Sequence, residues 1–481
     1  MFSFILAALS INAFAALLDP FFNLWDERFH ALVAKNMSLH MLKPTLYENP
    51  VLDIAYNNWD KFHIWLHKPP LFMWQSAVFF KMFGYSEFVF RIPNVLLGAV
   101  TVYGIYRSGK LLINHATGIF AVVLFCSSQF FVHLLSGSLS TDQNDYSFFA
   151  YTSLSIWSFV EYQTSQRKSW LIATAVFSGC AVLCKWLLGL FVYALWFLYT
   201  FLVYRFKFKK YLPIVIAFLV TLVIAAPWTI YTLMAYPQMA KWELSHSSSH
   251  FFTVVEGHSG DFLYHINYFD SIYGKNMLWL FLPSAYLFYR DFSNKKMAIA
   301  LLVSIFSVYL FFSLAATKMP SFTILVVLPI VLVFASLLNK IYCLIAAYLS
   351  PTKWYFQTLL VALLMVLFIT RFHVTKIHEQ HSTLQPNNPV RAQLLHNKKV
   401  FTSLRLPKNT ILVNIKGVHY IDAMFYTGLP AYQVMPSLQQ VQTTIAKGYR
   451  FAVFAKNQNV PNYLLNQPST ILIDEEIHGG Y

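Results

Sequence analysis

Five short polar clusters lie between long apolar segments, and each combines side chains that can move a proton or bind an anion. Acids, bases and histidines gathered at the mouth of a helical bundle are typical of an active site at a membrane surface. We therefore expect the clusters to face the same, exoplasmic side of a membrane. They occupy residues 26–28, 67–70, 141–145, 246–265 and 317–321.

Acidic residues of the first and third clusters are the candidate catalytic groups. Asp26 and Glu27 follow the first apolar segment, and Asp142 and Asp145 follow the third. A carboxylate near the bilayer is costly to bury unpaired, so it is either solvated or functional. As a general base it would deprotonate an acceptor hydroxyl or amine. Helix capping, by Asp26 at one helix start and by Thr141 or Asp142 at another, is an open alternative. Metal binding by Asp142 and Asp145 is a further one.

Four basic residues are candidates for binding a donor phosphate. Lys68 precedes two prolines that fix an extended turn, and a rigidly held lysine suits a phosphate. Arg91 lies on the same predicted side, against the trend of the positive-inside rule. Lys185 lies where two apolar segments must turn, so burying it would require an anionic partner. For Lys68 and Lys318, snorkelling toward lipid headgroups is the open alternative.

Histidines are the candidate metal ligands. His67 adjoins Lys68, and further histidines crowd residues 246–265. Together, His67 and His246 can form a zinc or other divalent metal site, with Glu243 or Glu256 as a further ligand. No compact HExxH spacing supports this site, so a solvated or hydrogen-bonded role for each histidine stays open.

The composition is that of a polytopic membrane protein surrounded by membrane lipids. Hydrophobic residues make up 57% and charged residues 11% of the 481 residues, whereas soluble domains have roughly 25% charged residues. The formal net charge of +15 is explained largely by basic cytoplasmic loops, so we expect no nucleic-acid partner. Apolar runs predict about eleven transmembrane helices. These are residues 1–18, 88–107, 116–135, 145–162, 169–186, 187–204, 211–232, 273–290, 297–316, 321–339 and 354–372.

Basic residues decide the predicted orientation. The run from Arg205 to Lys210 and similar basic groups fall in alternate connections, which should be cytoplasmic. The five polar clusters then lie in the exoplasmic connections. Two of these are long, residues 19–87 and 233–273, and loops of this length are usually functional. An amphipathic helix from Glu27 to Met41 is expected to lie along the membrane interface.

The last part of the chain, residues 376–481, predicts a small exoplasmic α/β domain that follows a transmembrane catalytic domain of residues 1–375. Short apolar runs alternate there with helical patterns, which is typical of α/β folds. The predicted strands are Thr410–Asn414, Arg450–Phe454 and Thr470–Ile473.

Six short motifs follow one another along roughly the first 340 residues. They are Trp25-Asp26-Glu27-Arg28, Leu66-His67-Lys68-Pro69-Pro70-Leu71, Arg91-Ile92-Pro93, Thr141-Asp142, Cys184-Lys185-Trp186-Leu187-Leu188-Gly189 and Thr317-Lys318-Met319-Pro320-Ser321. In this order they resemble the GT-C superfamily of multi-spanning glycosyltransferases, and within it the protein O-mannosyltransferases and the lipid A aminoarabinose transferases.

The resemblance implies an enzyme that transfers a hexosyl or pentosyl group from a polyprenyl-phosphate donor to lipid A, another glycan or a protein. It implies Asp26 as the catalytic carboxylate, Asp142 as the second acidic position, and Lys68 and Lys185 as donor-phosphate contacts. The family usually has an acidic residue where this chain has His67, so a divalent metal site is either kept with a changed ligand or lost. A bacterial inner membrane, with the active site on the periplasmic side, is inferred from the same likeness.

A transporter or flippase of an anionic lipid-linked substrate is the rival hypothesis. Such a protein should carry polar residues near the membrane midplane, broken helices and often repeated halves. This chain places its polar clusters at one predicted face and shows no internal repeat. The sequence therefore favours the transferase.

Overall fold

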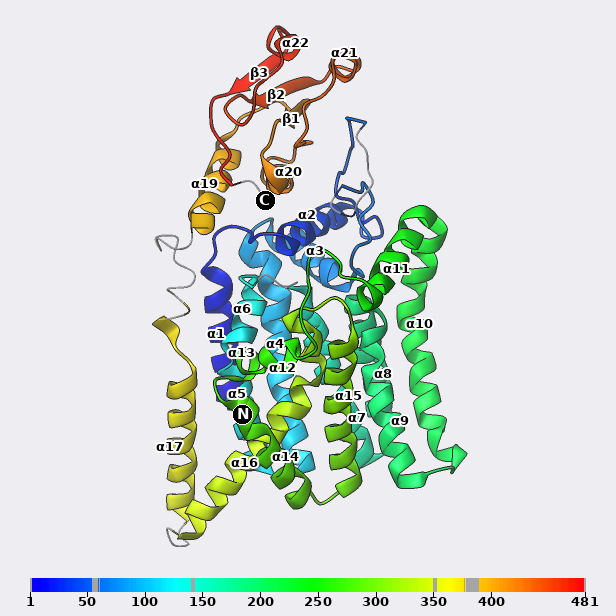
Figure 1. Ribbon diagram of the computed structural model, residues 1–481, viewed down its shortest axis with the longest axis vertical. Helices are drawn as coiled ribbons and strands as arrows, with labels where there is room; N and C mark the ends of the chain where they lie inside the picture. The colour runs from blue at the N-terminus through cyan, green and yellow to red at the C-terminus, as the bar shows by residue number, and fades with distance from the viewer. Residues whose placement is uncertain are drawn as a thin grey trace. The chain divides into compact units, whose positions relative to one another are not determined.

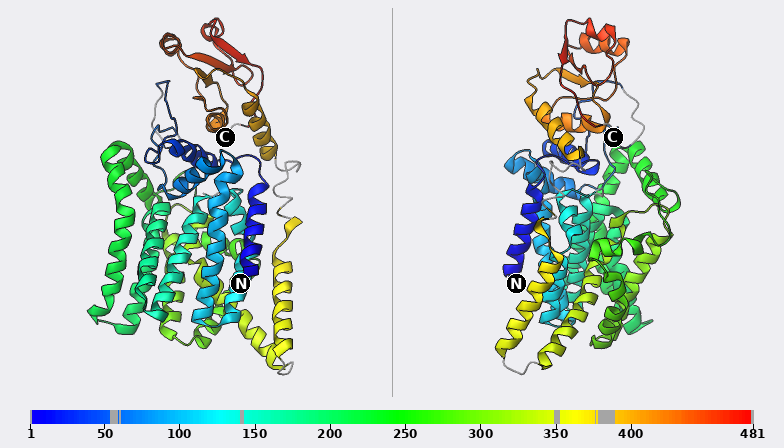
Figure 2. Two further views of the ribbon diagram at one scale, coloured as in Figure 1. Left: turned by 180° about the vertical axis from the view of Figure 1, so that it is seen from behind. Right: turned by 60° about the vertical axis from the view of Figure 1, so that its left-hand side comes forward.

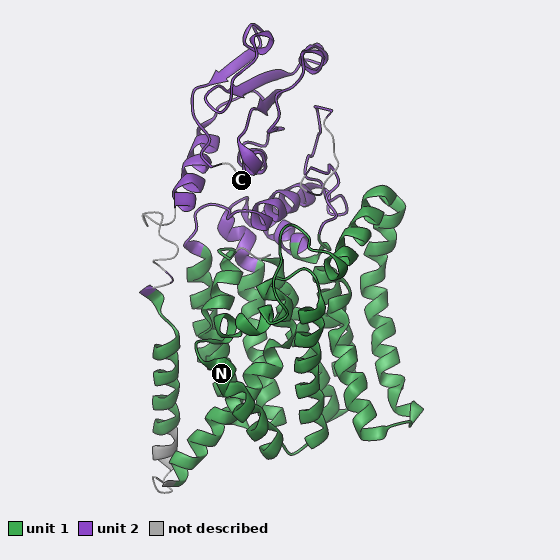
Figure 3. Cartoon of the chain, in the orientation of Figure 1, with its two compact units in different colours: residues 1–16, 68–72, 93–374 green, residues 17–67, 73–92, 375–481 purple. Residues whose placement is uncertain are grey.

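The chain divides into two compact units, which Figure 3 shows in different colours. Unit 1 comprises residues 1–16, 68–72 and 93–374, and unit 2 comprises residues 17–67, 73–92 and 375–481. Unit 2 thus combines the polar last part of the chain with residues of the first long predicted loop. The computed structural model describes residues 2–53, 59, 61–139, 143–348, 353–375, 377 and 389–479.

Unit 1 is helical, and several of its long helices run side by side (Figures 1 and 2). Apolar segments of this kind form helices because a helix satisfies its own backbone hydrogen bonds in lipid. Local signals mark some ends: the Asn114 side chain accepts from Thr117 N at the start of α5, and Gly137 ends α6 in the left-handed conformation. The helices are α1 (Phe2–Leu17), α4 (Glu87–Leu112), α5 (His115–Cys126), α6 (Gln129–Ser136), α7 (Asn144–Ser165), α8 (Lys168–Lys185), η1 (Trp186–Leu190), α9 (Phe191–Tyr204), η2 (Phe208–Tyr211), α10 (Leu212–Ala235), α11 (Pro237–Phe252), α12 (Tyr264–Asn267), α13 (Phe269–Tyr273), α14 (Met277–Asp291), α15 (Lys295–Leu314), η3 (Pro320–Val326), α16 (Val327–Tyr348) and α17 (Lys353–Arg371).

Five apolar helical stretches in the described ranges are long enough to cross a membrane, and a sixth results if α5 and α6, bent by 55°, count as one. The chain is therefore a multi-pass membrane protein. The predicted count of about eleven is not confirmed by these stretches. The five are Glu87–Leu112, Lys168–Tyr204, Phe208–Ala235, Lys295–Leu314 and Pro320–Ala347.

Unit 2 contains a three-stranded parallel sheet in the order β1-β2-β3 (Figure 1). β1 (Thr410–Val413), β2 (Arg450–Phe454) and β3 (Thr470–Ile473) fall within the three predicted strand segments. β1 is buried throughout, as is usual for strands of parallel sheets. A separate domain of residues 376–481 stays a prediction, because unit 2 also includes the first loop. The remaining elements of unit 2 are α2 (Asp26–Leu39), α3 (Leu71–Phe83), α19 (Pro389–Ser403), η4 (Gly417–His419), α20 (Tyr420–Thr427), α21 (Leu438–Ala446) and α22 (Asn462–Leu465).

α2 is a core element of unit 2. The helix forms close to where the sequence predicts it, but 11 of its 14 residues are buried. Phe29 packs against Trp59 with ring centroids 5.0 Å apart, and His30 packs against Trp65 at 5.3 Å. The amphipathic pattern does not reveal that the polar face has buried partners of its own. The position of this helix along the membrane interface stays a prediction.

Candidate active site

The first candidate carboxylate, Glu27, is locked in a buried ion pair with Arg91. Arg91 Nε lies 2.7 Å from Glu27 Oε1, and Nη2 lies 3.1 Å from Oε2. The same guanidinium donates to the carbonyl oxygens of Asp19 and Phe21, at 2.7 and 2.9 Å. Arg91 is 0% exposed and Glu27 is 2% exposed. Both charges are used inside unit 2, so the geometry favours a structural role over the catalytic and donor-phosphate roles predicted for them.

This network fixes the turn that leads into α2. Asn23 donates its backbone N–H to Glu27 Oε2 at 2.6 Å and its side-chain amide to the same oxygen at 3.0 Å. Trp25 adopts φ 64°, a conformation that costs a bulky residue about 1–3 kcal/mol and persists only where the surroundings impose it.

Asp26 is the first residue of α2 and is half-buried. Trp25, rather than Asp26, occupies the N-cap position, and no side chain caps this helix end. The capping role left open for Asp26 is therefore not observed. Of the two adjacent acids, Asp26 is the more exposed residue, and its catalytic role stays a prediction.

Lys185 lies in unit 1 beside a buried acid. Its Nζ forms an ion pair with Asp145 Oδ1, and the exposed fractions of the two side chains are 19% and 0%. Asp145 supplies the anionic partner that the sequence requires for a buried lysine at this turn. The lysine also lies over the Phe322 ring, 5.2 Å from its centroid. It keeps an exposed face that can meet an anion.

A tight turn holds Lys185 in place. α8 ends at Lys185 because the next residue, Trp186, has φ 50°. Ser178 Oγ donates to the Gly189 carbonyl oxygen at 2.8 Å. A Cβ atom at Gly189 would lie 2.2 Å from Val182 N, so only glycine fits. This explains why the Lys185 motif ends in glycine: η1 folds back on the backbone of α8.

Lys68 and Lys185 both affect the pKa of His250, which lies in α11. Burial, together with the positive charges of Lys68, His246, Lys185 and His258, lowers the pKa of His250 to about 4. Both lysines are therefore near enough to His250 for their charges to affect its pKa, and His250 is uncharged at neutral pH. Their role in binding the donor phosphate stays a prediction.

Glu243 faces the same group of charges. It is 1% exposed, and burial raises its pKa to about 8, opposed by Lys68 and supported by Glu256. Glu243 is therefore largely protonated near neutral pH. An anion entering this region would meet the lysines without a competing carboxylate at this position.

The predicted metal ligands do not form a site that matches a metal. His246 stacks on Trp242 and lies 4.0 Å from Glu256 Oε1, while His67 in unit 2 stacks on Trp59 at 4.5 Å. Within the described ranges, no three His, Cys, Asp or Glu side chains gather in a way that could hold a metal ion. Two side chains do not make the three- or four-ligand set usual for zinc. A divalent metal stays a prediction.

Lys318 has a structural position. It is 4% exposed, and its Nζ donates to the carbonyl oxygens of Phe312 and Ser313 at 2.9 and 2.6 Å, which caps the end of α15. Its backbone N–H and that of Thr317 donate to the carbonyls of His258 and His250, each at 2.9 Å. The motif therefore anchors the histidine-rich segment, and the geometry favours this over the predicted phosphate contact.

Asp142 lies outside the described residues, so its predicted role stays a prediction. The helix that follows, α7, begins after Gln143, and no side chain caps it.

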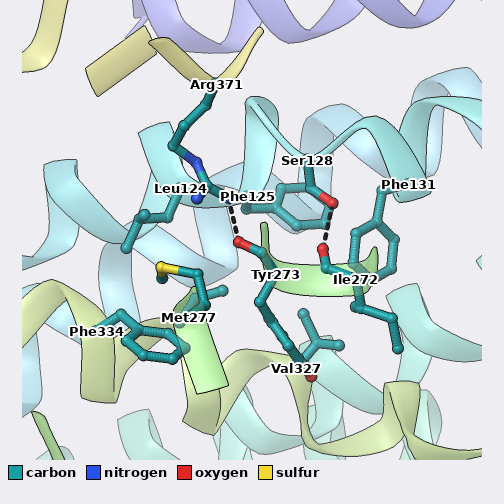
Figure 4. A pocket seen from close by; sticks show the side chains of 11 residues that line it. Leu124, Phe125, Ser128, Phe131, Ile272, Tyr273, Met277, Val327, Phe334 and Arg371 are labelled. Atoms are coloured by element: carbon teal, nitrogen blue, oxygen red, sulfur yellow. Dashed lines mark hydrogen bonds between the residues drawn. The ribbon is translucent and has the colours of Figure 1, made fainter. Parts of the chain in front are cut away.

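A cavity near Ser128 and Arg371 is too small to be the site (Figure 4). Its volume is about 10 Å³, which holds at most one water molecule. Arg371 Nη2 donates to the Tyr273 carbonyl at 2.6 Å, and Ser128 Oγ donates to the Ile272 carbonyl at 2.8 Å. These hydrogen bonds satisfy the backbone carbonyl oxygens of Tyr273 and Ile272.

Sequence reasoning missed the partners that the last part of the chain supplies within unit 2. Arg391 forms an ion pair with Asp19, and Lys398 Nζ lies 2.7 Å from Glu87 Oε1. No local pattern could have found them, because each pair joins residues more than 300 positions apart.

Comparison with known proteins finds solved structures with a similar fold. ArnT from Cupriavidus metallidurans, in a crystal structure bound to undecaprenyl phosphate, superposes with a TM-score of 0.67 at 14% identity, over 96% of this chain and 86% of that one. This chain therefore has a fold similar to that of ArnT. The archaeal oligosaccharyltransferase AglB from Archaeoglobus fulgidus, in complex with an inhibitory peptide and a dolichol-phosphate, matches with a TM-score of 0.54 at 9% identity, over 89% of this chain and 64% of that one.

Sequence comparison finds similarity over part of the chain. Residues 67–231 match the family described as dolichyl-phosphate-mannose-protein mannosyltransferase. An uncharacterised protein of Aquifex aeolicus (strain VF5) is 28% identical over 160 residues, which are 33% of this chain and 29% of that protein. The match spans less than a third of that relative's length.

Glu27 and Asp26 should differ in their effect on stability. Glu27→Gln leaves the Arg91 charge buried without its counter-charge, which we expect to cost about 3–5 kcal/mol. Asp26→Asn changes a half-buried group at the helix start and should cost no more than about 1 kcal/mol. Thermal unfolding of the purified variants in detergent measures both. Equal losses in the two variants would contradict the distinction drawn between these acids.

His265 should make stability depend on pH. It is 1% exposed, and burial, with the charge of Lys318, lowers its pKa to about 4. The unfolded chain takes up this proton near pH 6.5. Stability should therefore fall as the pH drops from about 6.5 to 4, by at most about 1.4 kcal/mol per pH unit. In His265→Phe, which suits the neighbouring Phe312 and Phe322 rings, the unfolding temperature should fall less between pH 7.5 and 5.5 than in the wild type; parallel curves would refute this.

Proposed function

We propose that this chain is a glycosyltransferase that moves a sugar from a polyprenyl-phosphate donor to an exoplasmic acceptor. The observation that carries the proposal is that Lys68 and Lys185 both lower the pKa of His250, in a chain whose fold is similar to that of ArnT. Two lysines near the same histidine suit a phosphate. The phosphate-bearing lipids in the ArnT and AglB structures support the same class of donor.

The proposed reaction breaks the bond between the sugar's anomeric carbon and the donor phosphate oxygen, and forms a bond from that carbon to the acceptor. Lys68 and Lys185 stabilise the negative charge that develops on the departing phosphate. Asp26 takes the proton of the acceptor hydroxyl or amine. Asp142 is proposed as the second acidic group near the acceptor. A single displacement would invert the anomeric centre.

The membrane arrangement that we propose has about eleven spans, in a bacterial inner membrane, with the polar clusters on the periplasmic side. The apolar stretch Lys168–Tyr204 has 37 residues. As one straight helix it would be roughly 55 Å long, against a hydrocarbon core of roughly 30 Å. Because α8 ends at Lys185 and the next residue, Trp186, has a positive φ, this stretch suits two spans, which raises the count above the five stretches.

We propose a hexose or pentose as the transferred sugar, and lipid A, another glycan or a protein as the acceptor. Each of these acceptors offers a hydroxyl or amine for Asp26 to deprotonate.

A transfer assay tests the proposed function. The purified full chain in detergent is mixed with labelled polyprenyl-phosphate sugars and membrane extract, and transfer of label is measured. Asp26→Asn and Lys68→Ala should each lower the turnover rate by about 100-fold or more. The exposed residues Asp53 and Lys207 provide matched controls, because Asp53→Asn and Lys207→Ala should keep wild-type turnover.

Two results would overturn the proposal. Label transfer that persists unchanged in both variants would remove the roles assigned to Asp26 and Lys68. No transfer from any such donor, with movement of the lipid-linked substrate across liposomes instead, would identify the chain as a transporter.

A further inference from the structure

The last part of the chain reaches the turn before α2 through a buried ion pair. Arg391, near the start of α19, forms an ion pair with Asp19, and the two residues are 5% and 1% exposed. The guanidinium also lies over the Phe21 ring, 5.0 Å from its centroid. Burial lowers the pKa of Arg391 to about 10, so the group stays charged at neutral pH and Asp19 keeps its counter-charge.

The ion pair continues into the network that fixes Glu27. Asn23 Nδ2 donates to Asp19 Oδ2 at 3.1 Å and to Glu27 Oε2 at 3.0 Å. Arg91 binds Glu27 on its other side and donates to the Asp19 carbonyl at 2.7 Å. Arg391 is thus joined to the residue that directly follows Asp26 by a continuous chain of buried polar contacts.

A second residue of α19 contacts the same region. Lys398 Nζ donates to the Pro20 carbonyl and to Glu87 Oε1, both at 2.7 Å. Glu87 also accepts from Tyr426 Oη at 2.6 Å. Glu87 lies one helical turn before Arg91 in α4. α19 therefore holds both the turn and the start of the helix that carries Arg91.

A third contact lies on the other side of Asp26. Arg28 Nη1 is 2.9 Å from Asp422 Oδ2, with side chains 0% and 7% exposed. His419 Nδ1 lies 3.1 Å from the same carboxylate. Residues before and after Asp26 are thus held by side chains from α19 and α20.

We infer that Arg391 is a positioning residue for Asp26, and that the last part of the chain, residues 389–479, completes the active site by holding the turn from Asp19 to Trp25. This inference rests on the proposed function, in which Asp26 is the base. A turn with a residue at φ 64° keeps its course only where contacts on several sides impose it, and Arg391 supplies one side.

The test uses the full chain and three variants. Arg391→Met should lower kcat for label transfer about 10-fold or more and leave KM for the donor within about 3-fold, because donor binding is assigned to Lys68 and Lys185. Arg391→Lys keeps the charge and should recover part of the loss. The exposed arginine of the same segment, changed in Arg405→Met, should behave as wild type.

A charge-neutral double variant separates positioning from stability. Asp19→Asn with Arg391→Met removes both charges, so no unpaired charge stays buried and the unfolding temperature should recover toward wild type. If Arg391 positions Asp26, kcat should stay low in this stable protein. A double variant with wild-type kcat would overturn the inference, as would wild-type kcat in Arg391→Met.

Hydrogen exchange provides a readout that does not need activity. In Arg391→Met, the peptide spanning residues 19–28 should exchange faster, while α11 in unit 1 should be unchanged. If the wild type transfers no label, the proposed function fails, and exchange alone decides the inference. Faster exchange confined to residues 19–28 then supports the positioning contact, and unchanged exchange there overturns it.

Discussion

A buried ion pair between Glu27 and Arg91 determines the course of the chain before α2. An unpaired charge in a protein interior costs several kcal/mol, so each partner holds the other in place. Arg91 adds bonds to two carbonyls of the turn, and Glu27 adds bonds to Asn23. The strained backbone at Trp25 persists because these bonds leave the turn no other course. Asp26 follows immediately, half-buried, so the structural pair determines where the proposed catalytic carboxylate begins its helix.

Unit 1 uses charge in a different way. There Asp145 partly neutralises Lys185, and burial keeps His250 uncharged and Glu243 protonated near neutral pH. Lys185 is held by a rigid turn, and Lys68 precedes two prolines. Lysines held in this way suit the phosphate of the proposed donor. In this account, the Glu27–Arg91 pair holds the backbone, whereas the lysines of unit 1 are proposed to bind the substrate.

Much of the local structure can be predicted from the sequence. The side-chain partners of residues far apart in the chain cannot. The three strands and the anionic partner of Lys185 follow from local apolar runs and from the cost of burying a lysine. The structural role of Arg91 could not be predicted, because its ion pair with Glu27 joins residues 64 positions apart. In the local sequence, each residue looks like a separate catalytic or phosphate-binding group. For Lys318, the local pattern does not distinguish a lysine that caps α15 from one that binds phosphate. The ion pair of Arg391 could not be predicted from any local pattern, because its partner Asp19 lies near the other end of the sequence.

The charges of Glu27 and Arg91 stabilise the fold as a pair, and each depends on the other. A double-mutant cycle of Glu27→Gln, Arg91→Met and the double variant measures this most directly through the free energy of unfolding. We predict a coupling energy of about 2 kcal/mol or more, because either single change leaves a buried charge and the double change leaves none. Single losses that add within about 0.5 kcal/mol in the double variant would contradict the account.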